Sequence, residues 1–119
     1  MEAVSLARKF EQIDEMWSPR IAAELNGQYI KLVKFRGEFV WHHHALEDEL
    51  FLVVKGQMRM RFRDRDVMVN PGEFIVVPAG VEHCPVAETE THVLLFEPKS
   101  TLNTGNVTND RTLHELGKV

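Results

Sequence analysis

One cysteine, Cys84, is all that the 119-residue chain contains, so an intramolecular disulfide is impossible. A chain of this kind does not depend on an oxidising compartment. Long apolar runs are lacking as well. Arg8, Lys9 and Glu11 interrupt the N-terminal segment, which therefore holds no signal core, and no later stretch reaches the length of a membrane span. These absences predict a cytoplasmic protein with no membrane partner.

The chain also lacks a cluster of basic residues. Its 14 Lys and Arg residues stand against 18 Asp and Glu residues, which gives a net charge of -4. Because contacts with phosphates need clustered Lys and Arg, we expect no nucleic-acid partner. No repeat, low-complexity tract or linker rich in Pro, Gly or Ser divides the sequence, and its length suits one domain. We therefore expect a single domain over residues 1–119.

Short β-type runs separated by turn residues make up most of the chain. A short helix is expected over residues 5–13, where apolar residues recur at helical spacing. The expected turns are Asn26-Gly27, Arg36-Gly37, Lys55-Gly56, Asp64-Arg65-Asp66, Asn70-Pro71-Gly72 and Pro78-Ala79-Gly80. This spacing predicts an all-β sandwich or barrel with its core over about residues 20–98 and its last strand at residues 91–97. The polar tail over residues 99–119 is expected to be a loosely packed extension.

Four of the six histidines fall in two short segments. In a strand, successive side chains alternate between faces, so His42 and His44 share one face and His43 takes the other. Glu49 follows past a short turn, and a return strand can set its carboxylate opposite the two imidazoles. His83 is distant in sequence but can lie near them in a closed barrel. Three imidazoles and a carboxylate suit one divalent transition metal ion, whether Fe, Mn, Zn, Ni or Cu. We predict metal ligation by His42, His44, Glu49 and His83.

Two motifs surround these candidate ligands. The first consists of Gly37, His42, His44, Glu49 and Gly56, and the second of Gly72, Pro78, Gly80 and His83. In both spacing and residue type the chain resembles the small single-domain bacterial cupins (the cupin type-2 conserved barrel), often described as mannose-6-phosphate isomerase-like. It departs from the pattern at two places: Gly37 is one residue closer to the first histidine, and Ala87 replaces an asparagine. The resemblance implies an antiparallel double-stranded β-helix, also called a jelly roll, with a bound metal ion.

The metal site leads to two functional hypotheses. The first is a metal-dependent enzyme of oxygenase, isomerase or lyase type, for example a non-haem dioxygenase, acting on a small polar substrate. Its pocket is expected to be lined by Val40, Phe51, Val53, Met58 and Met60. Apart from Glu38 near the rim, no second carboxylate or Lys is placed clearly inside, which favours redox or Lewis-acid chemistry over proton transfer. The alternative is a non-catalytic protein that uses its metal ion to bind or sense a small molecule.

Large aromatic residues are expected on the outside of the barrel. Phe39 and Trp41 share the parity of His43, opposite the predicted ligands. Aromatic side chains in that position need cover, either from the segment around Trp17 or from a second subunit. Because cupins commonly pair, we predict a homodimer with a symmetric interface at Phe39 or Trp41. Cys84 adjoins His83 but points to the opposite face, so a small buried or interface thiol is expected there rather than a nucleophile.

Overall fold

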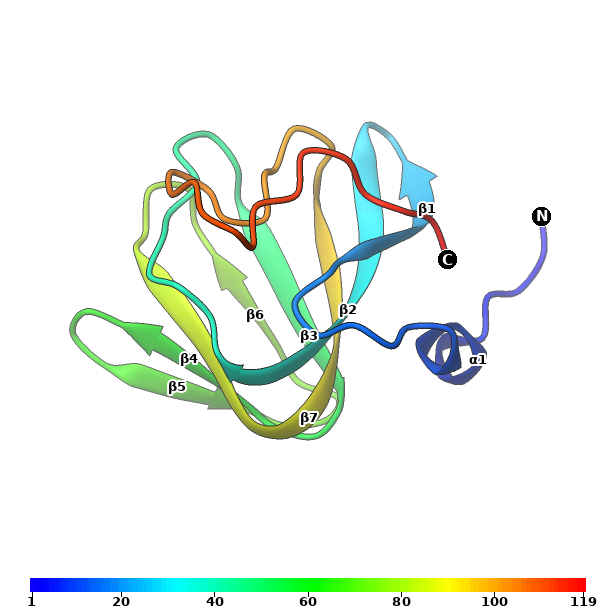
Figure 1. The fold of residues 1–119 in the computed structure, drawn as a ribbon, viewed down its shortest axis with the longest axis horizontal. Coiled ribbons are helices and arrows are strands. Elements are labelled where there is room, and N and C mark those ends of the chain that lie inside the picture. Colours follow the sequence, from blue (N-terminus) through cyan, green and yellow to red (C-terminus); the bar gives the residue numbers. More distant parts are fainter.

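Strands dominate the computed structural model, which describes residues 1–119 (Figure 1). One helix, α1 (Leu6–Glu11), precedes seven strands. The strands are β1 (Arg20–Leu25), β2 (Gln28–Glu38), β3 (Glu49–Lys55), β4 (Met58–Phe62), β5 (Asp66–Val69), β6 (Phe74–Val77) and β7 (His83–Pro98). Every pair of neighbouring strands is antiparallel. The all-β barrel expected from the sequence is confirmed.

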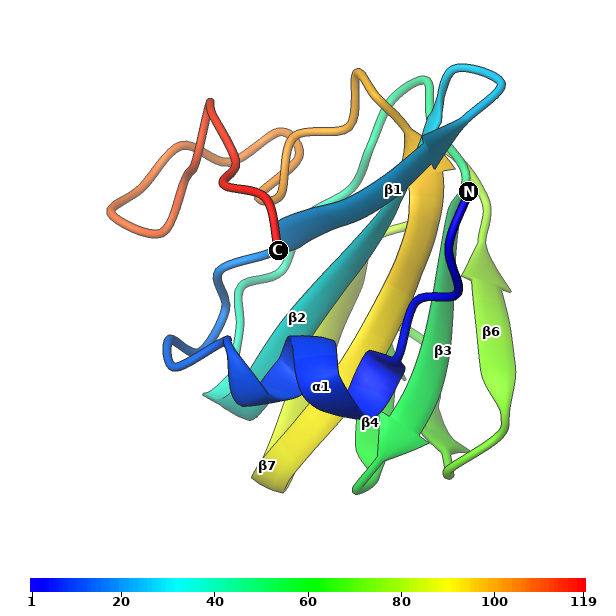
Figure 2. The same ribbon diagram turned by 90° about the vertical axis from the view of Figure 1, so that its right-hand side faces the viewer.

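Helix α1 lies against the outer face of the barrel (Figure 2). Ser5 caps it, because its Oγ accepts a hydrogen bond from the backbone N–H of Arg8 at 3.3 Å. Phe10 and Ile13 are buried against Leu32 of β2, which confirms the helical spacing seen in the sequence. The chain has no helix that is long and apolar enough to cross a membrane.

Two glycine turns fix the register of neighbouring strands. Asn26 and Gly27 connect β1 to β2 with φ values of 49° and 77°, the left-handed pair that a two-residue hairpin requires. Gly56 connects β3 to β4 with φ 87°. A Cβ at Gly56 would lie 3.0 Å from the Cα of Thr91, so this crossing has no room for a side chain.

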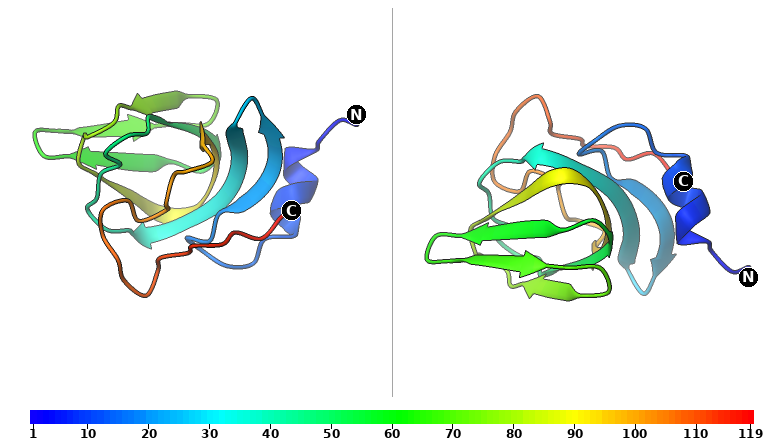
Figure 3. Two further views of the ribbon diagram at one scale, coloured as in Figure 1. Left: turned by 90° about the horizontal axis from the view of Figure 1, so that it is seen from above. Right: turned by 90° about the horizontal axis from the view of Figure 1, so that it is seen from below.

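The long strand β7 is the central strand of the single seven-stranded sheet that forms the barrel (Figures 1 and 3). Its beginning, from His83 to Val86, pairs with β4, and its end pairs with both β2 and β3. The hydrogen-bonded order is β1-β2-β7-β3-β6, with β5 joined to β7 through β4. The sequence placed only residues 91–97 in the last strand, because Pro85 lacks an N–H and reads as a strand breaker. In the structure the carbonyl of Pro85 accepts from the N–H of Phe39, so the strand begins earlier.

The region around the three consecutive histidines also differs from expectation. Strand β2 does not break at Arg36-Gly37 but passes through it with an irregular register between Phe35 and Gly37, and it ends at Glu38. Gly37 has φ 85°, which suits a bulge that turns the strand. Residues 39–48 therefore form an extended loop rather than a strand. The alternation of His42, His43 and His44 survives because an isolated bridge aligns His42 with His83.

The tail over residues 99–119 packs against the barrel, so the expectation of a loose extension was wrong. Thr101 and Thr104 are buried. Near the end of the tail, the N–H of Val119 donates to the carbonyl of Ile21 at 3.0 Å. The tail was misjudged because it contains no periodic apolar pattern: polar hydrogen bonds, rather than an apolar face, hold most of it in place.

Candidate metal centre

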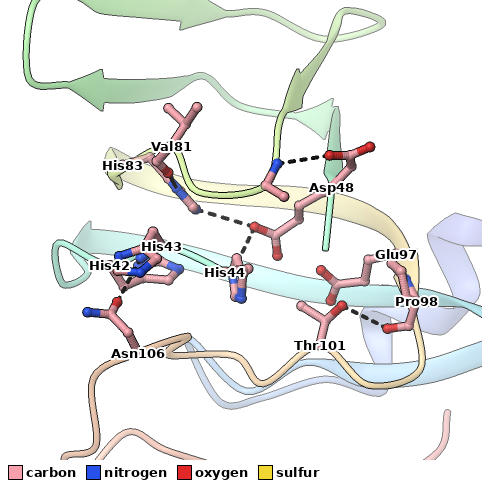
Figure 4. Close-up of polar contacts among 12 residues, drawn as sticks. His42, His43, His44, Asp48, Val81, His83, Glu97, Pro98, Thr101 and Asn106 are labelled. Carbon is pink, nitrogen blue, oxygen red and sulfur yellow. Dashed lines mark hydrogen bonds and ion pairs between the residues drawn. The ribbon is translucent and has the colours of Figure 1, made fainter. Parts of the chain in front are cut away.

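The four predicted ligands converge inside the barrel, and Figure 4 shows the three histidines among them, His42, His44 and His83. One ligand atom from each of His42, His44, Glu49 and His83 lies within 4.8 Å of every other. The Oε1 of Glu49 is 3.2 Å from Nε2 of His44 and 3.3 Å from Nε2 of His83. All four residues are buried. A set of three imidazoles and one carboxylate is thus gathered from three separate parts of the chain.

Backbone contacts hold the ligand-bearing segments in register. Glu49 is the first residue of β3 and His83 the first of β7. His42 and His83 exchange two backbone hydrogen bonds of 3.0 and 2.9 Å, which places their imidazoles side by side. The carbonyl of His44 accepts from the N–H of Gly80 at 2.8 Å, which ties the loop to the turn before β7. His43 is only partly buried and its imidazole is not in the cluster.

Hydrogen bonds to carbonyl oxygens fix the tautomers of two histidines. Nδ1 of His42 lies 2.9 Å from the carbonyl oxygen of Val40, and Nδ1 of His83 lies 2.9 Å from that of Val81. Because a carbonyl oxygen only accepts, each Nδ1 carries the proton and donates. The lone pair of each ring is then on Nε2, the atom that faces the cluster, as a metal ligand requires.

Three atoms of the cluster are buried without a hydrogen-bond partner: Nε2 of His44, Oε1 of Glu49 and Nε2 of His83. Burying polar atoms in this way is costly unless something satisfies them. Oε1 of Glu49 and Nε2 of His83 are acceptors, and Nε2 of His44 is a third when the proton of that ring is on Nδ1. Lone pairs directed at a common point are satisfied by a cation, so the residues present fit a divalent metal ion.

Electrostatics favours the deprotonated forms that metal binding needs. Burial, together with the neighbouring His83, lowers the pKa of His42 to about 4. Burial alone would raise the pKa of Glu49, but the neighbouring Glu97, His44 and His83 outweigh it and hold that pKa well below its usual range. At neutral pH, His42 therefore offers a neutral ring and Glu49 a carboxylate.

A buried acid and base that sequence reasoning missed lie behind Glu49. Nζ of Lys31 is 2.8 Å from Oε1 of Glu97, and the two side chains are each 2% exposed. Burial raises the pKa of Glu97 well above its usual range, and the adjacent charge of Glu49 raises it further, while Lys31 opposes the shift. The sequence does contain a signal for the inward position of both residues. Lys31 is two residues from Val33, and Glu97 is two residues from Leu95, so each shares a strand face with a buried apolar residue.

A small cavity of about 30 Å³ adjoins the cluster. Its walls combine aromatic and aliphatic side chains with a few polar ones, as small-molecule sites do. The lining residues are Trp17, Pro19, Val33, Phe35, Phe39, His42, Glu49, Phe51, Leu95, Glu97 and Asn103. Of the side chains expected there, Phe51 is present. Val53, Met58 and Met60 are buried elsewhere in the same core, and Val40 is only half-buried.

The expected outward position of Phe39 was wrong. Its ring stacks on Trp17 at 4.8 Å and meets the ring of His42 edge-on at 5.5 Å, so it faces the cavity. The end of β2 at Glu38 removes the strict alternation on which the expectation relied. Trp41 does lie outside, where the guanidinium of Arg63 sits 3.8 Å from its ring centre. Cys84 is buried, and burial together with Glu38 raises its pKa to about 11, which leaves the thiol protonated.

An antiparallel barrel that gathers three histidines and one glutamate at one end has the architecture and donor set of a cupin. The family model for the cupin domain (Cupin_2) matches residues 31–97, and the chain belongs to this family. A crystal structure of a cupin-2 domain containing protein from Shewanella frigidimarina NCIMB 400 superposes with a TM-score of 0.81. It is 43% identical, and the match covers 82% of this chain and 95% of that one.

Two relatives from Bacillus subtilis (strain 168) are also similar. The uncharacterized protein YdbB is 33% identical over 78 residues, which cover 65% of this chain and 69% of that protein. Quercetin 2,3-dioxygenase is 36% identical over 69 residues, which cover 53% of this chain but only 20% of that enzyme. This chain is therefore similar to one part of a much longer dioxygenase.

Proposed function

We propose that this cupin, acting as a single domain over residues 1–119, binds one divalent transition metal ion and is a metal-dependent enzyme for a small polar molecule. The ligands are His42, His44, Glu49 and His83. The observation that carries the proposal is the group of buried ligand atoms that face one another without partners. One cation would satisfy all of them at once. Neutral imidazoles with one carboxylate suit Fe, Mn, Zn, Ni or Cu.

Oxygenase chemistry is the first reaction class that we propose. A bound metal ion would supply Lewis-acid or redox chemistry at the coordination positions that the protein leaves open. The similarity to part of quercetin 2,3-dioxygenase supports this class. The rings of Trp17, Phe39 and Phe51 line the adjoining cavity and make much of its wall apolar, as suits a site that shields reactive species from side reactions.

Isomerase or lyase chemistry needs a group that carries a proton, and Glu97 provides one. The sequence suggested that the pocket lacks a second carboxylate, and that expectation was wrong. Glu97 lines the cavity beside Glu49, and burial raises its pKa well above the usual range. A carboxyl group with a raised pKa can hold a proton at neutral pH and deliver it to a substrate. Because of Glu97, we propose proton-transfer reactions of isomerase or lyase type as a second reaction class beside oxygenation.

The alternative function is metal-assisted binding or sensing of a small molecule without turnover. The narrowness of the cavity favours it, because the space open to water-sized molecules is only about 30 Å³. A protein that remained in this closed form could still bind an exchangeable water or a small anion at the metal ion.

Metal analysis followed by a turnover assay tests these proposals. Untagged protein should contain about one equivalent of metal by elemental analysis, and the His83→Ala variant should contain far less. Dioxygen uptake after Fe(II) loading, with quercetin as the first compound, would support the oxygenase. A ligand-induced rise in melting temperature without product would support the sensing function. Metal-free wild-type protein that takes up none of the five metals would refute the metal site itself.

A further inference from the structure

The C-terminal cap, defined as residues 102–116, lies across the end of the barrel that holds the metal centre (Figure 3, left; Figure 1). It contains no helix or strand. Both of its ends are attached to the barrel: Thr101 is buried beside Lys31, and the carbonyl of Gly117 accepts from the N–H of Ile21. Such a loop, with anchored ends and an irregular middle, is the kind of element that serves as a lid.

The middle of the cap is held to the rest of the chain by three hydrogen bonds. Two join Asn106 to the backbone of His43: the N–H of His43 donates to Oδ1 of Asn106 at 2.8 Å, and the N–H of Asn106 donates to the carbonyl of His43 at 3.1 Å (Figure 4). The third runs from the guanidinium of Arg111 to the carbonyl of Glu38 at 2.8 Å. The other bonds of the cap are internal, for example between Thr104 and Thr112.

His43, to which Asn106 of the cap is hydrogen-bonded, lies between two predicted ligands. His43 separates His42 from His44, so a shift of its peptide moves both imidazoles. The contact is close: a Cβ at Gly105 would overlap the carbonyl oxygen of His43 and would lie 3.0 Å from Cδ2 of His42. Glycine is therefore required at this point for the cap to reach the ligand loop.

The cavity beside the metal centre is narrow with the cap in place. The space in it that is open to water-sized molecules is about 30 Å³. Most of its walls belong to hydrogen-bonded strands. Trp17 is fixed to β2 by its backbone N–H, which donates to Lys34, and by its indole N–H, which donates to Arg36. The cap, which contributes Asn103 to the wall, is held to the rest of the chain by three hydrogen bonds over 15 residues and by the guanidinium of Arg111 beside the rings of Trp17 and Phe39.

We propose that the C-terminal cap is the lid of the metal pocket and that Asn106 is its latch, a positioning residue that holds the His43 peptide and through it the imidazoles of His42 and His44. The metal-dependent part of this inference rests on the proposed function. In the closed state Asn106 orients the ligands, and release of its two hydrogen bonds both opens the cavity and loosens the site.

Release of Co²⁺ into excess EDTA tests the latch. Asn106→Ala removes the acceptor for the N–H of His43 and should speed release about 10-fold or more, the usual scale for groups that orient a ligand. Its Co²⁺ visible spectrum should also shift. Asn106→Asp keeps the acceptor oxygen and should restore slow release. Asn109→Ala removes a bond inside the cap, from the N–H of Arg111, and should behave like the wild type. Equal rates in all variants, or equal acceleration by Asn109→Ala, would overturn the latch.

Amide hydrogen exchange in the metal-free protein tests the lid without any metal. The amides of His43 and Asn106 depend on each other, so they should exchange at similar rates and faster than the amide of His42, which is bonded to His83. Asn106→Ala should speed exchange at His43 and leave His42 unchanged. If His43 and Asn106 exchange as slowly as His42, no local opening occurs and the lid is refuted. A wild type that binds no Co²⁺ but shows this local opening would refute the metal site and leave the lid supported.

Discussion

Lys31 and Glu97 form a buried ion pair directly behind the carboxylate of Glu49. The two residues come from neighbouring strands and are diagonal to one another in the register, since Lys31 pairs with Leu95 and Tyr29 with Glu97. Lys31 Nζ also lies 3.4 Å from the carbonyl of Thr101, at the foot of the tail. The pair thus links the wall of the barrel, the candidate metal centre and the start of the C-terminal segment.

Removing one partner of this pair should destabilise the barrel strongly. Glu97→Met leaves a buried ammonium without its acceptor and should lower the free energy of unfolding by about 3–5 kcal/mol in urea titrations. Lys31→Met should cost less, because the raised pKa of Glu97 lets that carboxyl group stay neutral without its partner. The double variant Lys31→Met/Glu97→Met should recover part of the loss. Arg59→Met, which breaks an exposed pair with Asp66, is the matched control and should change stability by about 0–1 kcal/mol.

The three consecutive histidines provide an internal control for the metal site. Replacing His42, His44 or His83 with Ala should reduce metal content sharply, since each loses a ligand atom. Glu49→Gln should weaken binding by removing the only anionic ligand. Elemental analysis of untagged protein makes the measurement.

His43→Ala is the control for that series. Its imidazole lies outside the cluster, and the contacts that it makes with Asn106 involve only its backbone. Near-normal metal content is therefore expected. A His43→Ala protein that lost its metal, beside a His42→Ala protein that kept it, would reverse the assignment of faces.

Acid should weaken both the metal-free fold and metal binding. Unfolded histidine has a pKa near 6.5, whereas His42 in the fold has a pKa of about 4. Between those values the unfolded chain binds a proton that the folded chain does not. Stability present above pH 6.5 is therefore lost as the pH falls towards 4, by about 3 kcal/mol in total for this group.

Urea unfolding of the metal-free protein at several pH values measures this effect. His42→Gln, which does not titrate there, should show a shallower fall between pH 6.5 and 4. Identical slopes for the variant and the wild type would exclude His42 as the source. In the metal-bound protein, loss of metal is expected as the pH drops through about 5, because protonated imidazoles do not ligate.

Because Phe39 faces the cavity, Trp41 is the residue at which we predict the homodimer interface. Trp41→Glu should yield monomers in sedimentation, because it removes the aromatic surface that Arg61 and Arg63 flank. Phe74→Glu is the comparison, because Phe74 is 59% exposed on β6. A dimer that survives Trp41→Glu but is lost in Phe74→Glu would place the interface on β6.

The clustering of His42, His44, Glu49 and His83 could be predicted from the sequence because these residues lie in two motifs with fixed spacing. To bring Glu49 and His83 close to the other two histidines, the chain needs only the short turns that the sequence predicts. Lys31 and Glu97 were missed for a different reason. A charged residue in a strand is normally assigned to the solvent face, and only the parity with Val33 and Leu95 places these two inside.

The remaining differences concern segments in which tertiary contacts decide the local structure. The sequence predicts a turn at Gly37. In the structure the partner strand β7 continues past this point, and β2 forms a bulge there instead. The sequence of the cap has no apolar periodicity from which its position could be predicted. Its placement depends on single contacts such as that between Asn106 and His43, 63 residues apart, which neither segment reveals on its own.

Strand β7 also determines when the protein can fold during synthesis. It contributes the central partner of β2, β3 and β4, yet it is the last strand to leave the ribosome. Until Pro98 has emerged, each of these three strands lacks one of its two neighbours and exposes unpaired backbone N–H and C=O groups with which other chains can pair. Closure then requires contacts between residues far apart in sequence, which is intrinsically slow. A nascent chain stalled before β7 should therefore be the species most in need of a chaperone.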